Sequence, residues 1–567
     1  METAGPKQLV EAYIEAYNRF DVAGMLAPLH NDVVFRNISN GEVNLTTTGK
    51  ESFHQQAEQA TQYFSQREQR VTDWQVNGQR VEAAIDYTAV AAIEFPNGLK
   101  PGDALHMQGR SVFDIENGQI ISIEDISYPT APASALTSLT DFQTLLLLGS
   151  GAREHALAEK LTRDGATVLV LPGNAGIPNS HSEIDPLDFE AVKAFAQAHG
   201  AKLIVVGPEA PLAAGITDFF AGSDIQVFGP TRSAARLESS KVWSKEFMHR
   251  YGVVTAQAWP FQSDNIVAAR AKSAELGGHV VVKYDGLAAG KGVYVCSSLE
   301  EAESALDDLQ ASYTGWFSFL LEEKLTGPEI SIIGLTDGHE IKLLATSQDH
   351  KQLLANDLGP NTGGMGAYCP VPFADDKVLA AIRRDIIDPT LRGLQHEQFE
   401  FRGFLYFGIM LTPTGPKLLE YNVRLGDPEA EVLLPGLDSS LLTLIEATLN
   451  GTLAHEGVRQ RPGAFVGVVL ASGGYPAPKF PIGFPITGLD NLPAGVRAYH
   501  GATKRDEAGQ LVTNGGRVLV LTAHGSDLEE ATVRAYEACA RVTFEGAYFR
   551  TDIAQRPAPV LTASVVN

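Results

Sequence analysis

The stretch from Lys283 to Val293 carries the residues best suited to binding phosphate groups. It reads Lys-Tyr-Asp-Gly-Leu-Ala-Ala-Gly-Lys-Gly-Val and follows an apolar, β-branched run. That run predicts a buried strand ending at Lys283, and the glycines after it let backbone N–H groups approach anionic oxygens without interference from a Cβ atom. Lys283 and Lys291 would supply positive charge. On its own, the same pattern also fits an ordinary strand turn with two solvated lysines.

A second feature far downstream supports the phosphate interpretation. Glu420 and Asn422 are two residues apart in a strand-like run, Leu418–Arg424, so their side chains should project from the same face. Mg²⁺ is commonly held by one or two protein oxygens, with water and substrate phosphates completing its coordination. The lysines and this oxygen pair together predict one site for the phosphates of a nucleoside triphosphate and its metal ion.

The overall composition excludes several classes of function. The 567 residues include 68 Asp and Glu against 44 Lys and Arg, a balance that disfavours nonspecific nucleic-acid binding. The chain shows neither an apolar segment of membrane-spanning length nor an N-terminal export signal. Its three cysteines lie far apart, which argues against a disulfide framework or a zinc site and suits a reducing compartment. We therefore expect a cytoplasmic protein of two to four domains with no nucleic-acid or membrane partner.

The first 128 residues differ in character from the rest. They begin with an amphipathic helix over Leu9–Phe20 and continue through alternating strands such as Arg80–Ala89 and His106–Ile115, a pattern typical of an α+β domain. A segment rich in Pro, Ala, Ser and Thr follows, and its composition predicts a linker over residues 129–142.

This first segment resembles the NTF2-like, SnoaL-like family. The likeness rests on Tyr13, on Tyr17–Asp21 and on the strand pair around Asn117-Gly118. It implies a cone-shaped pocket that is either catalytic or serves only in binding or dimerisation. Three residues are candidates to line that pocket: Asp21, His30 and His106. A helix-capping aspartate and structural histidines would explain these residues as well.

After the linker, the chain restarts with the pattern of an α/β domain. A strand over Thr144–Leu148, a glycine turn at Gly149 and a helix through Leu161 are followed by a second strand, Leu203–Val206, with its own glycine turn. In such a sheet the loops gather at the carboxyl ends of the strands, where ligands bind. The first glycine turn lacks the third glycine of a dinucleotide-binding fingerprint, which disfavours a nicotinamide enzyme.

From about Thr144 to Arg556 the sequence resembles the phosphoribosylamine–glycine ligases, also called glycinamide ribonucleotide synthetases, a family of ATP-grasp enzymes in purine biosynthesis. Ten blocks in unbroken order carry the resemblance: Gly149–Ala156, Pro172–Gly176, Gly207–Leu212, Phe228–Pro230, Leu237–Lys241, Asp285–Gly292, Thr346–Lys351, Gly359–Tyr368, Asn422–Glu429 and Asn514–Arg517. The resemblance implies an α/β plus α+β multidomain fold. Its expected parts are an NTF2-like cone (1–128), an α/β pre-ATP-grasp domain (143–240), an ATP-grasp lid (241–325), an ATP-grasp central subdomain (326–462) and a C-terminal domain (463–567).

The same resemblance implies an ATP-dependent ligase. Members of the family phosphorylate the glycine carboxylate with ATP and then join the acyl phosphate to the amine of 5-phosphoribosylamine, which gives glycinamide ribonucleotide, ADP and phosphate. No nucleophilic side chain is required, so catalysis should consist of positioning the substrates and neutralising charge on the phosphoryl group. The implied cofactors are ATP and Mg²⁺ or Mn²⁺, and the implied partners are the small-molecule substrates.

The matching motifs also imply roles for individual residues. For ATP these are Lys241, Lys283, Gly290 and Gly292 at the phosphates, the hinge residues Glu322, Glu323 and Leu325 at adenine, and Glu329 at the ribose. The implied metal ligands are Glu420 and Asn422, and the implied catalytic residues are Lys291, Arg424 and Asp427. The residues implied to bind glycine or phosphoribosylamine are Gly151, Glu154, Asn174, Asp349, Lys351, Thr362, Gly363, Gly364 and Arg424.

Simpler explanations and other functions stay open at this point. Asp349 and Lys351 could form a surface ion pair, and Arg424 could pair with Asp427. The chain could instead be a paralogue that joins another amino acid or amine in secondary metabolism. The N-terminal domain could catalyse a second step, sense a small molecule, or dimerise.

Overall fold

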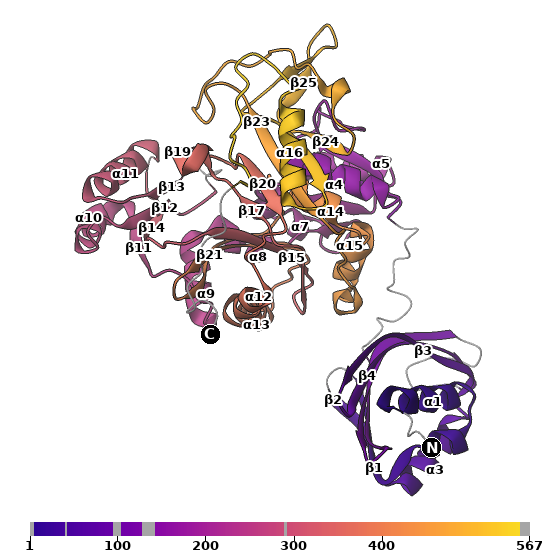
Figure 1. Cartoon of the computed structure of the whole chain (residues 1–567). Coiled ribbons are helices and arrows are strands. Elements are labelled where there is room, and N and C mark those ends of the chain that lie inside the picture. The colour runs from indigo at the N-terminus through magenta and orange to yellow at the C-terminus, as the bar shows by residue number, and fades with distance from the viewer. Residues whose placement is uncertain are drawn as a thin grey trace. The chain divides into compact units, whose positions relative to one another are not determined.

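The computed structural model describes residues 5–39, 42–93, 104–127, 142–287, 292–313 and 315–555. The chain divides into two compact units, Met1–Leu136 and Thr137–Asn567 (Figure 1). None of the described helices combines the length and the apolar character needed to cross a bilayer.

A six-stranded sheet that curves around a helix forms the N-terminal unit (Figure 1). Its strand order is β2-β1-β6-β5-β4-β3, and neighbouring strands are antiparallel except β1 and β6. The elements are α1 (Pro6–Asn18), α2 (Val22–Leu26), β1 (Leu29–Ser39), β2 (Glu42–Thr48), α3 (Lys50–Ala60), β3 (Phe64–Asn77), β4 (Arg80–Ala91), β5 (Ala104–Glu116) and β6 (Gln119–Ser127). In its apolar core, Tyr13 of α1 packs edge-on against Phe113 of β5, with ring centroids 5.6 Å apart. The strands predicted over Arg80–Ala89 and His106–Ile115 are confirmed, and they correspond to β4 and β5.

The residues expected to line a pocket in this unit have local structural roles where the structure describes them. Phe20 adopts a left-handed φ of 57° and separates α1 from α2. The helix predicted over Leu9–Phe20 corresponds to α1, which ends at Asn18. Asp21 caps α2 by accepting a hydrogen bond from the backbone N–H of Gly24 at 2.9 Å. The Nδ1 atom of His30 accepts a hydrogen bond from a backbone N–H two residues on. His106 belongs to β5, but its side chain lies outside the described residues.

The C-terminal unit begins with a four-stranded parallel sheet of order β10-β9-β7-β8. Its elements are β7 (Thr144–Gly149), α4 (Ala152–Arg163), β8 (Thr167–Pro172), α5 (Phe189–Ala198), β9 (Leu203–Val206), α6 (Glu209–Ala214), α7 (Ile216–Phe219), β10 (Gln226–Phe228) and α8 (Arg232–Ser239). Every residue of β9 is buried, as a continuous aliphatic strand of a covered parallel sheet should be. The predicted strand, glycine turn and helix after residue 143 are confirmed.

Two further four-stranded sheets follow along the chain. The first has the order β11-β14-β12-β13 and comprises β11 (Ala258–Gln262), β12 (Val280–Tyr284), β13 (Val293–Val295) and β14 (Ser318–Glu323), with the helices α9 (Lys241–Tyr251), α10 (Ile266–Glu275) and α11 (Leu299–Ser312). The second has the order β16-β15-β21-β22 and comprises β15 (Glu329–Thr336), β16 (Ile341–Leu343), β21 (Gly403–Thr412) and β22 (Gly415–Asn422), with α12 (Asp376–Ile382), a π-helical turn at Arg383–Ile387, α13 (Asp388–His396), α14 (Ala430–Gly436) and α15 (Leu441–Asn450). The strand predicted to end at Lys283 is confirmed as β12, which continues one residue further, to Tyr284.

The last sheet combines strands from two distant parts of the chain. Its order is β17-β20-β23-β27-β24, so that β20 (Gly366–Cys369) pairs with β23 (Ala464–Ala471) across almost a hundred residues of sequence. The remaining members and neighbours are β17 (Gln348–Asp349), β24 (Val496–His500), β27 (Arg517–Gly525), α16 (Leu528–Cys539) and two hairpins, β18 (Gln352–Leu354) with β19 (Leu358–Asn361) and β25 (Thr503–Arg505) with β26 (Leu511–Thr513). The loop between β19 and β20 is thereby held beside the C-terminal strands.

A buried lysine ties α4 to the start of α15. Lys160 is 2% exposed, and its Nζ donates to Asp164 Oδ1 at 2.5 Å and to the Ser439 carbonyl at 2.8 Å. The other oxygen of Asp164 accepts from the backbone N–H of Leu441 at 2.6 Å. Both charges are removed from water, so each depends on the other.

We expect Lys160→Ala to lower the free energy of unfolding by about 3 kcal/mol, because it leaves the Asp164 carboxylate buried without its partner cation. Denaturant unfolding of the full chain, followed by circular dichroism, measures the change. Lys202→Ala is the matched control, since Lys202 pairs with Asp224 on the exposed surface and should leave the unfolding midpoint unchanged. Equal changes in the free energy of unfolding for the two substitutions would contradict the assignment of Lys160 as the buried partner of Asp164.

Candidate active site

Three lysines converge near the start of the glycine-rich loop. Lys241 opens α9, and its Nζ donates to the carbonyl of Gly286 at 2.9 Å. The Nζ of Lys283 lies 3.0 Å from Glu322 Oε2, and the Nζ of Lys245 lies 3.3 Å from the same oxygen. Glu322 is 2% exposed, so its carboxylate serves to hold the two lysines in place. Positive charge is thus concentrated at one edge of the sheet that contains β12.

Two residues expected in this loop cannot be placed. Gly290 and Lys291 lie outside the described residues, whereas Gly292 is described and its carbonyl accepts a hydrogen bond from the backbone N–H of Tyr284 at 2.8 Å. Their expected roles at the phosphates and in catalysis stay predictions.

Lys245 was not expected at the site. It follows Lys241 by four residues on α9 and therefore lies on the same helix face. Burial lowers the pKa of Lys245 to about 8, although the neighbouring Glu322 carboxylate acts in the opposite direction. Its Nζ also donates to Thr255 Oγ1 at 2.6 Å. The spacing of four from Lys241 was the signal in the sequence that could have revealed it.

The expected hinge residues lie at the end of β14. The side chain of Glu323 accepts from the Nζ of Lys417 at 3.4 Å, and its backbone N–H donates to the Gln257 carbonyl at 2.9 Å. Leu325 comes two residues after the end of the strand and is half-buried. The expected role of Glu322, Glu323 and Leu325 in recognising adenine stays a prediction.

Glu420 and Asn422 lie on β22, where Glu420 is opposite Gly408 of β21. The absence of a side chain at that glycine leaves space beside the Glu420 carboxylate, which is 34% exposed. Burial acts to raise the pKa of Glu420, but the cations of Lys351, Lys283 and Lys241 outweigh it and lower the pKa to about 2. The carboxylate is therefore ionised and surrounded by positive charge.

This donor set fits a magnesium ion shared with phosphates. The Oδ1 of Asn422 accepts one hydrogen bond, from Arg424 at 3.2 Å, which leaves a second lone pair. Within the described residues, no group of three or more His, Cys, Asp or Glu side chains forms a potential metal site. One carboxylate and one amide oxygen match an ion that retains water and phosphate ligands rather than a closed protein cage.

Lys351 links the metal pair to the residue expected at the ribose. Its Nζ forms an ion pair with Glu329 and lies 3.8 Å from Glu420 Oε1. The alternative of a surface ion pair between Asp349 and Lys351 is therefore wrong. Asp349 instead accepts from the backbone N–H of His350 at 2.6 Å, and burial together with the nearby Glu429 carboxylate raises its pKa.

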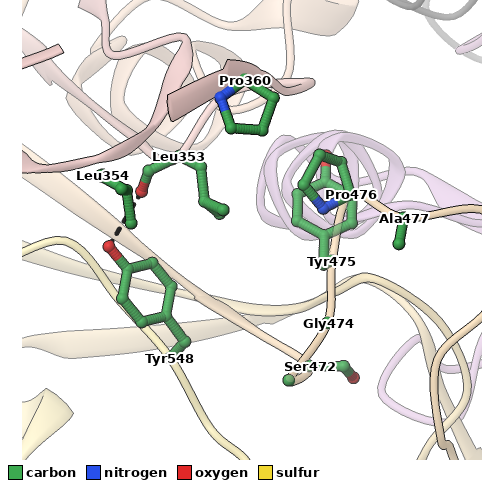
Figure 2. Close-up of a pocket in the computed structure, with 10 residues that line it drawn as sticks. Leu353, Leu354, Pro360, Ser472, Gly474, Tyr475, Pro476, Ala477 and Tyr548 are labelled. Carbon is green, nitrogen blue, oxygen red and sulfur yellow. Dashed lines mark hydrogen bonds between the residues drawn. The ribbon is translucent and has the colours of Figure 1, made fainter. Parts of the chain in front are cut away.

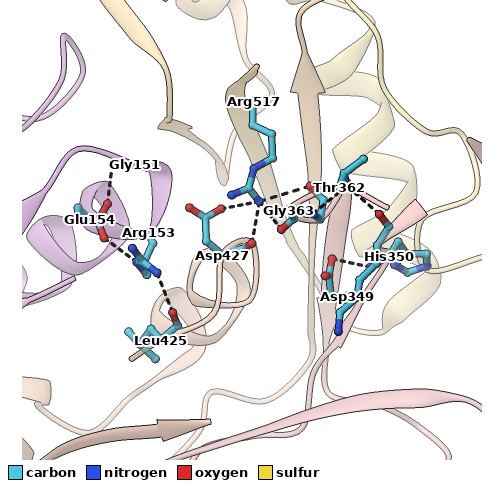
Figure 3. A network of polar contacts seen from close by, with 12 residues as sticks. Gly151, Arg153, Glu154, Asp349, His350, Thr362, Gly363, Leu425, Asp427 and Arg517 are labelled. Atoms are coloured by element: carbon cyan, nitrogen blue, oxygen red, sulfur yellow. Dashed lines mark hydrogen bonds and ion pairs between the residues drawn. The ribbon is translucent and has the colours of Figure 1, made fainter. Parts of the chain in front are cut away.

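The loop of Thr362, Gly363 and Gly364 is fastened from several sides (Figure 3). The hydroxyl of Thr362 donates to the Lys351 carbonyl at 2.8 Å and accepts from the backbone N–H of Gly364 at 3.0 Å. Arg517 Nη1 donates to the Gly363 carbonyl at 2.7 Å. Gly364 has a φ of 113°, and a Cβ atom there would lie 2.6 Å from Asp349 Oδ1, so this turn requires glycine.

Asp427 pairs with Arg517 rather than with Arg424. The Nη1 of Arg517 lies 3.0 Å from Asp427 Oδ1 and donates to the Asp427 carbonyl at 2.7 Å (Figure 3). Arg424 instead contacts Glu238 at 2.9 Å and Glu209 at 3.3 Å. The alternative of an Arg424–Asp427 ion pair is therefore wrong, because two carboxylates from the preceding domain take up the Arg424 guanidinium.

The remaining expected substrate residues stabilise the first glycine turn. Glu154 accepts from the backbone N–H of Gly151 at 2.6 Å and from Arg153 Nε at 2.6 Å (Figure 3). Both N–H groups of the Asn174 amide donate to backbone carbonyls, those of Ser150 at 2.8 Å and His500 at 2.7 Å. Asn174 and Glu154 therefore shape this turn, and direct contact of either with a substrate stays a prediction.

Two cavities open near these residues. The smaller, about 220 Å³, is lined by residues of the glycine turn and the C-terminal sheet, namely Ser150, Gly151, Ala152, Asp427, Gly501, Ala502, Arg517, Leu519 and Val520. The larger, about 680 Å³, lies between the β18–β19 hairpin and the Ser472–Ala477 segment, and its lining is mostly apolar (Figure 2). The lining of the smaller cavity includes Gly151, one of the residues expected to bind substrate, and Asp427, one of those expected in catalysis. The larger cavity adjoins the loop of Thr362, Gly363 and Gly364 through Tyr475, whose hydroxyl accepts from the Gly363 backbone N–H at 3.0 Å.

Comparison with known proteins identifies four consecutive segments. A SnoaL-like domain matches residues 10–123, and the N, ATP-grasp (A) and C domains of phosphoribosylglycinamide synthetase match residues 143–238, 239–430 and 465–556. A phosphoribosylamine–glycine ligase of Xylella fastidiosa (strain Temecula1 / ATCC 700964) is 43% identical over 423 residues, which cover 73% of this chain and 97% of the relative.

Solved structures agree with this assignment. The crystal structure of a phosphoribosylamine–glycine ligase from Thermotoga maritima has a TM-score of 0.63 at 35% identity and covers 72% of this chain and all of that one. The biotin carboxylase domain of a Hydrogenobacter thermophilus 2-oxoglutarate carboxylase, at 18% identity and a TM-score of 0.54, covers 72% of this chain and 91% of its own and shares the fold alone.

These matches confirm the predicted multidomain fold, the enzyme class and the N-terminal SnoaL-like domain. The chain therefore belongs to the phosphoribosylamine–glycine ligase family of ATP-grasp enzymes.

Proposed function

We propose that this protein joins glycine to 5-phosphoribosylamine in purine biosynthesis. The γ-phosphoryl group of ATP is transferred to the glycine carboxylate, which releases ADP and leaves glycyl phosphate. The amine of phosphoribosylamine then attacks the carbonyl carbon, phosphate departs, and the nitrogen loses a proton to give glycinamide ribonucleotide. The observation that carries the proposal is the ionised Glu420 carboxylate surrounded by Lys241, Lys283 and Lys351, because this arrangement suits a metal-bound triphosphate.

We assign the binding of ATP and its metal ion to three lysines and to two oxygen-bearing side chains of β22. Lys241, Lys245 and Lys283 would neutralise charge on the transferring phosphoryl group. Glu420 and Asn422 would hold a divalent ion, Mg²⁺ or Mn²⁺, which would supply further positive charge at the phosphates. The biotin carboxylase domain of the same fold was crystallised with MgADP, which supports MgADP as a ligand of this fold.

We assign the binding of glycine and phosphoribosylamine to the region of the smaller cavity. Arg517 lines this cavity, and its guanidinium suits a phosphate or a carboxylate. Asp427 orients Arg517, and Arg424 joins this region to the Asn422 ligand. These residues would align the glycyl carbonyl with the incoming amine, so that proximity supplies much of the rate enhancement.

The domain limits and the cellular setting are part of the proposal. Division at 143–240, 241–325, 326–462 and 463–567 is supported by the family segments matched at 143–238, 239–430 and 465–556. The acidic composition supports a cytoplasmic enzyme without a nucleic-acid partner. Dimerisation through the N-terminal domain stays a prediction.

Release of ADP by the purified full chain tests the proposal. The assay supplies Mg²⁺-ATP, glycine and freshly generated phosphoribosylamine and omits each component in turn. ADP release that requires both glycine and phosphoribosylamine supports the proposed function. Release with another amino acid or amine instead would establish a paralogue, and no release with any acceptor would refute ligase activity.

We expect Glu420→Gln to reduce the rate of ADP formation by about a hundredfold or more, because a neutral amide cannot offset the metal charge at the phosphates. Raising the Mg²⁺ concentration should recover part of the loss. Glu300→Gln, on the exposed face of α11, is the control and should leave the rate unchanged. An unchanged rate for Glu420→Gln would remove this residue from the metal site.

Lys245 gives nucleotide binding a pH dependence. Bound phosphates favour its protonated form, but in the free protein its pKa of about 8 means that it loses the proton above pH 8. We therefore expect the affinity for MgADP to be nearly constant below about pH 7, to fall about twofold between pH 7 and pH 8 and to fall about fivefold between pH 8 and pH 9. Isothermal titration calorimetry at pH 7, 8 and 9 measures this, and Lys245→Met should abolish the dependence. The same fall in the variant would show that another group titrates.

A further inference from the structure

The N-terminal unit gathers polar side chains on the face of its sheet that covers the core. Asp125 of β6 is directly opposite Ser111 of β5 in the ladder. Each lies two residues from a buried core residue on its own strand, Ile123 and Phe113, and so shares the core-facing side. The sheet curves around α1 on this side (Figure 1). Polar groups facing the core of so small a domain need hydrogen-bond partners.

Arg67 of β3 has a buried cationic group that is incompletely satisfied. The residue is 7% exposed, and its guanidinium lies over the ring of Tyr17, 3.8 Å from the centroid, and over Phe20 at 4.3 Å. Its Nε donates to the Tyr17 carbonyl at 3.0 Å. Nη2 is buried and has no hydrogen-bond partner among the residues that the structure describes. Within this unit, an acceptor from a ligand would satisfy it.

Asp125 offers a complementary acceptor. Its Oδ1 accepts from the Ser111 hydroxyl at 2.6 Å, whereas Oδ2 accepts no hydrogen bond from the described part of the chain. The residue as a whole is half-buried although it faces the core. Burial raises the pKa of this carboxyl to about 6, and the Ser111 hydrogen bond opposes the shift only in part.

Two tyrosine hydroxyls accompany these charged groups. The hydroxyl of Tyr17 lies 3.4 Å from that of Tyr87, a long hydrogen bond that a better acceptor could replace. The two rings are 6.3 Å apart, and Phe64 packs edge-on against Tyr87 at 6.2 Å. Aromatic walls with a few convergent polar groups are typical of sites for small planar ligands.

We propose that the N-terminal SnoaL-like domain binds a small planar hydroxy carboxylate, whose carboxylate accepts from Arg67 and the tyrosine hydroxyls and whose hydroxyl donates to Asp125. The geometry favours a carboxylate because the free Nη2 is a charged donor, and it favours a hydroxyl on the same molecule because Asp125 keeps an unused acceptor. This site is separate from the ligase residues and does not depend on the proposed ligase function.

Binding of 4-hydroxybenzoate to the full chain tests the proposal by isothermal titration calorimetry. We expect saturable binding of one molecule per chain. Benzoate, which lacks the hydroxyl, and phenol, which lacks the carboxylate, should each bind at least tenfold more weakly. Arg67→Met and Asp125→Asn should weaken the binding of 4-hydroxybenzoate at least tenfold.

Arg36→Met is the matched control, because Arg36 belongs to the same sheet and pairs with Glu124 at 2.9 Å on the opposite side from the core. It should leave the affinity unchanged. If Arg67→Met does not fold by circular dichroism, Tyr87→Phe removes a single hydroxyl and should still weaken binding severalfold. Absence of saturable binding to the wild-type chain at millimolar probe, or binding that the substitutions at Arg67, Asp125 and Tyr87 leave unchanged, would overturn the proposal.

Discussion

The attraction between the Glu420 carboxylate and the lysines around it organises the candidate active site. Burial alone would favour a protonated Glu420, yet three cations hold it ionised. Those cations come from different elements, Lys241 from α9, Lys283 from β12 and Lys351 from the turn after β17. Each is therefore held by its own partner. The carboxylates of Glu322 and Glu329 hold Lys283 and Lys351, and the Gly286 carbonyl accepts a hydrogen bond from Lys241. In a chain with a formal net charge of −24, this local reversal of sign makes an anionic nucleotide acceptable.

The sequence was most informative where function depends on local spacing. Lys283 at the end of a buried strand and the Glu420, Asn422 pair on one strand could be predicted because strand periodicity decides which face a side chain occupies. The strands and helix that open the C-terminal unit were equally predictable, since glycine turns and aliphatic runs mark their limits. The roles implied by the matching motifs covered more residues. They did not specify which side chains contact one another in the folded protein.

Pairings between distant segments could not be predicted. Arg424 and Asp427 are three residues apart, which suggested a local ion pair, but Glu209 and Glu238 lie more than 180 residues earlier and compete successfully for the guanidinium. Arg517 belongs to a recognised motif, yet only the strand order shows that it reaches Gly363. The polar face of the N-terminal sheet was also missed, because Arg67 and Asp125 are on strands separated by two others and share no sequence motif. The aspartate and histidine expected there instead have local backbone roles.

The five-stranded sheet has a consequence for how the chain can be divided. Its strand β20 lies before residue 462 but pairs with β23 after it, so the expected limit between the central and C-terminal domains runs through a continuous hydrogen-bonded sheet. A gene fragment that ended near that limit would leave β20 with an exposed edge of unpaired N–H and C=O groups, the kind of edge that recruits other chains into aggregates. The same fragment would lose Arg517 and Tyr475, which fasten the Gly363 loop. We therefore expect the chain to tolerate recombination better in the predicted linker, residues 129–142, than within the ligase domains that follow it.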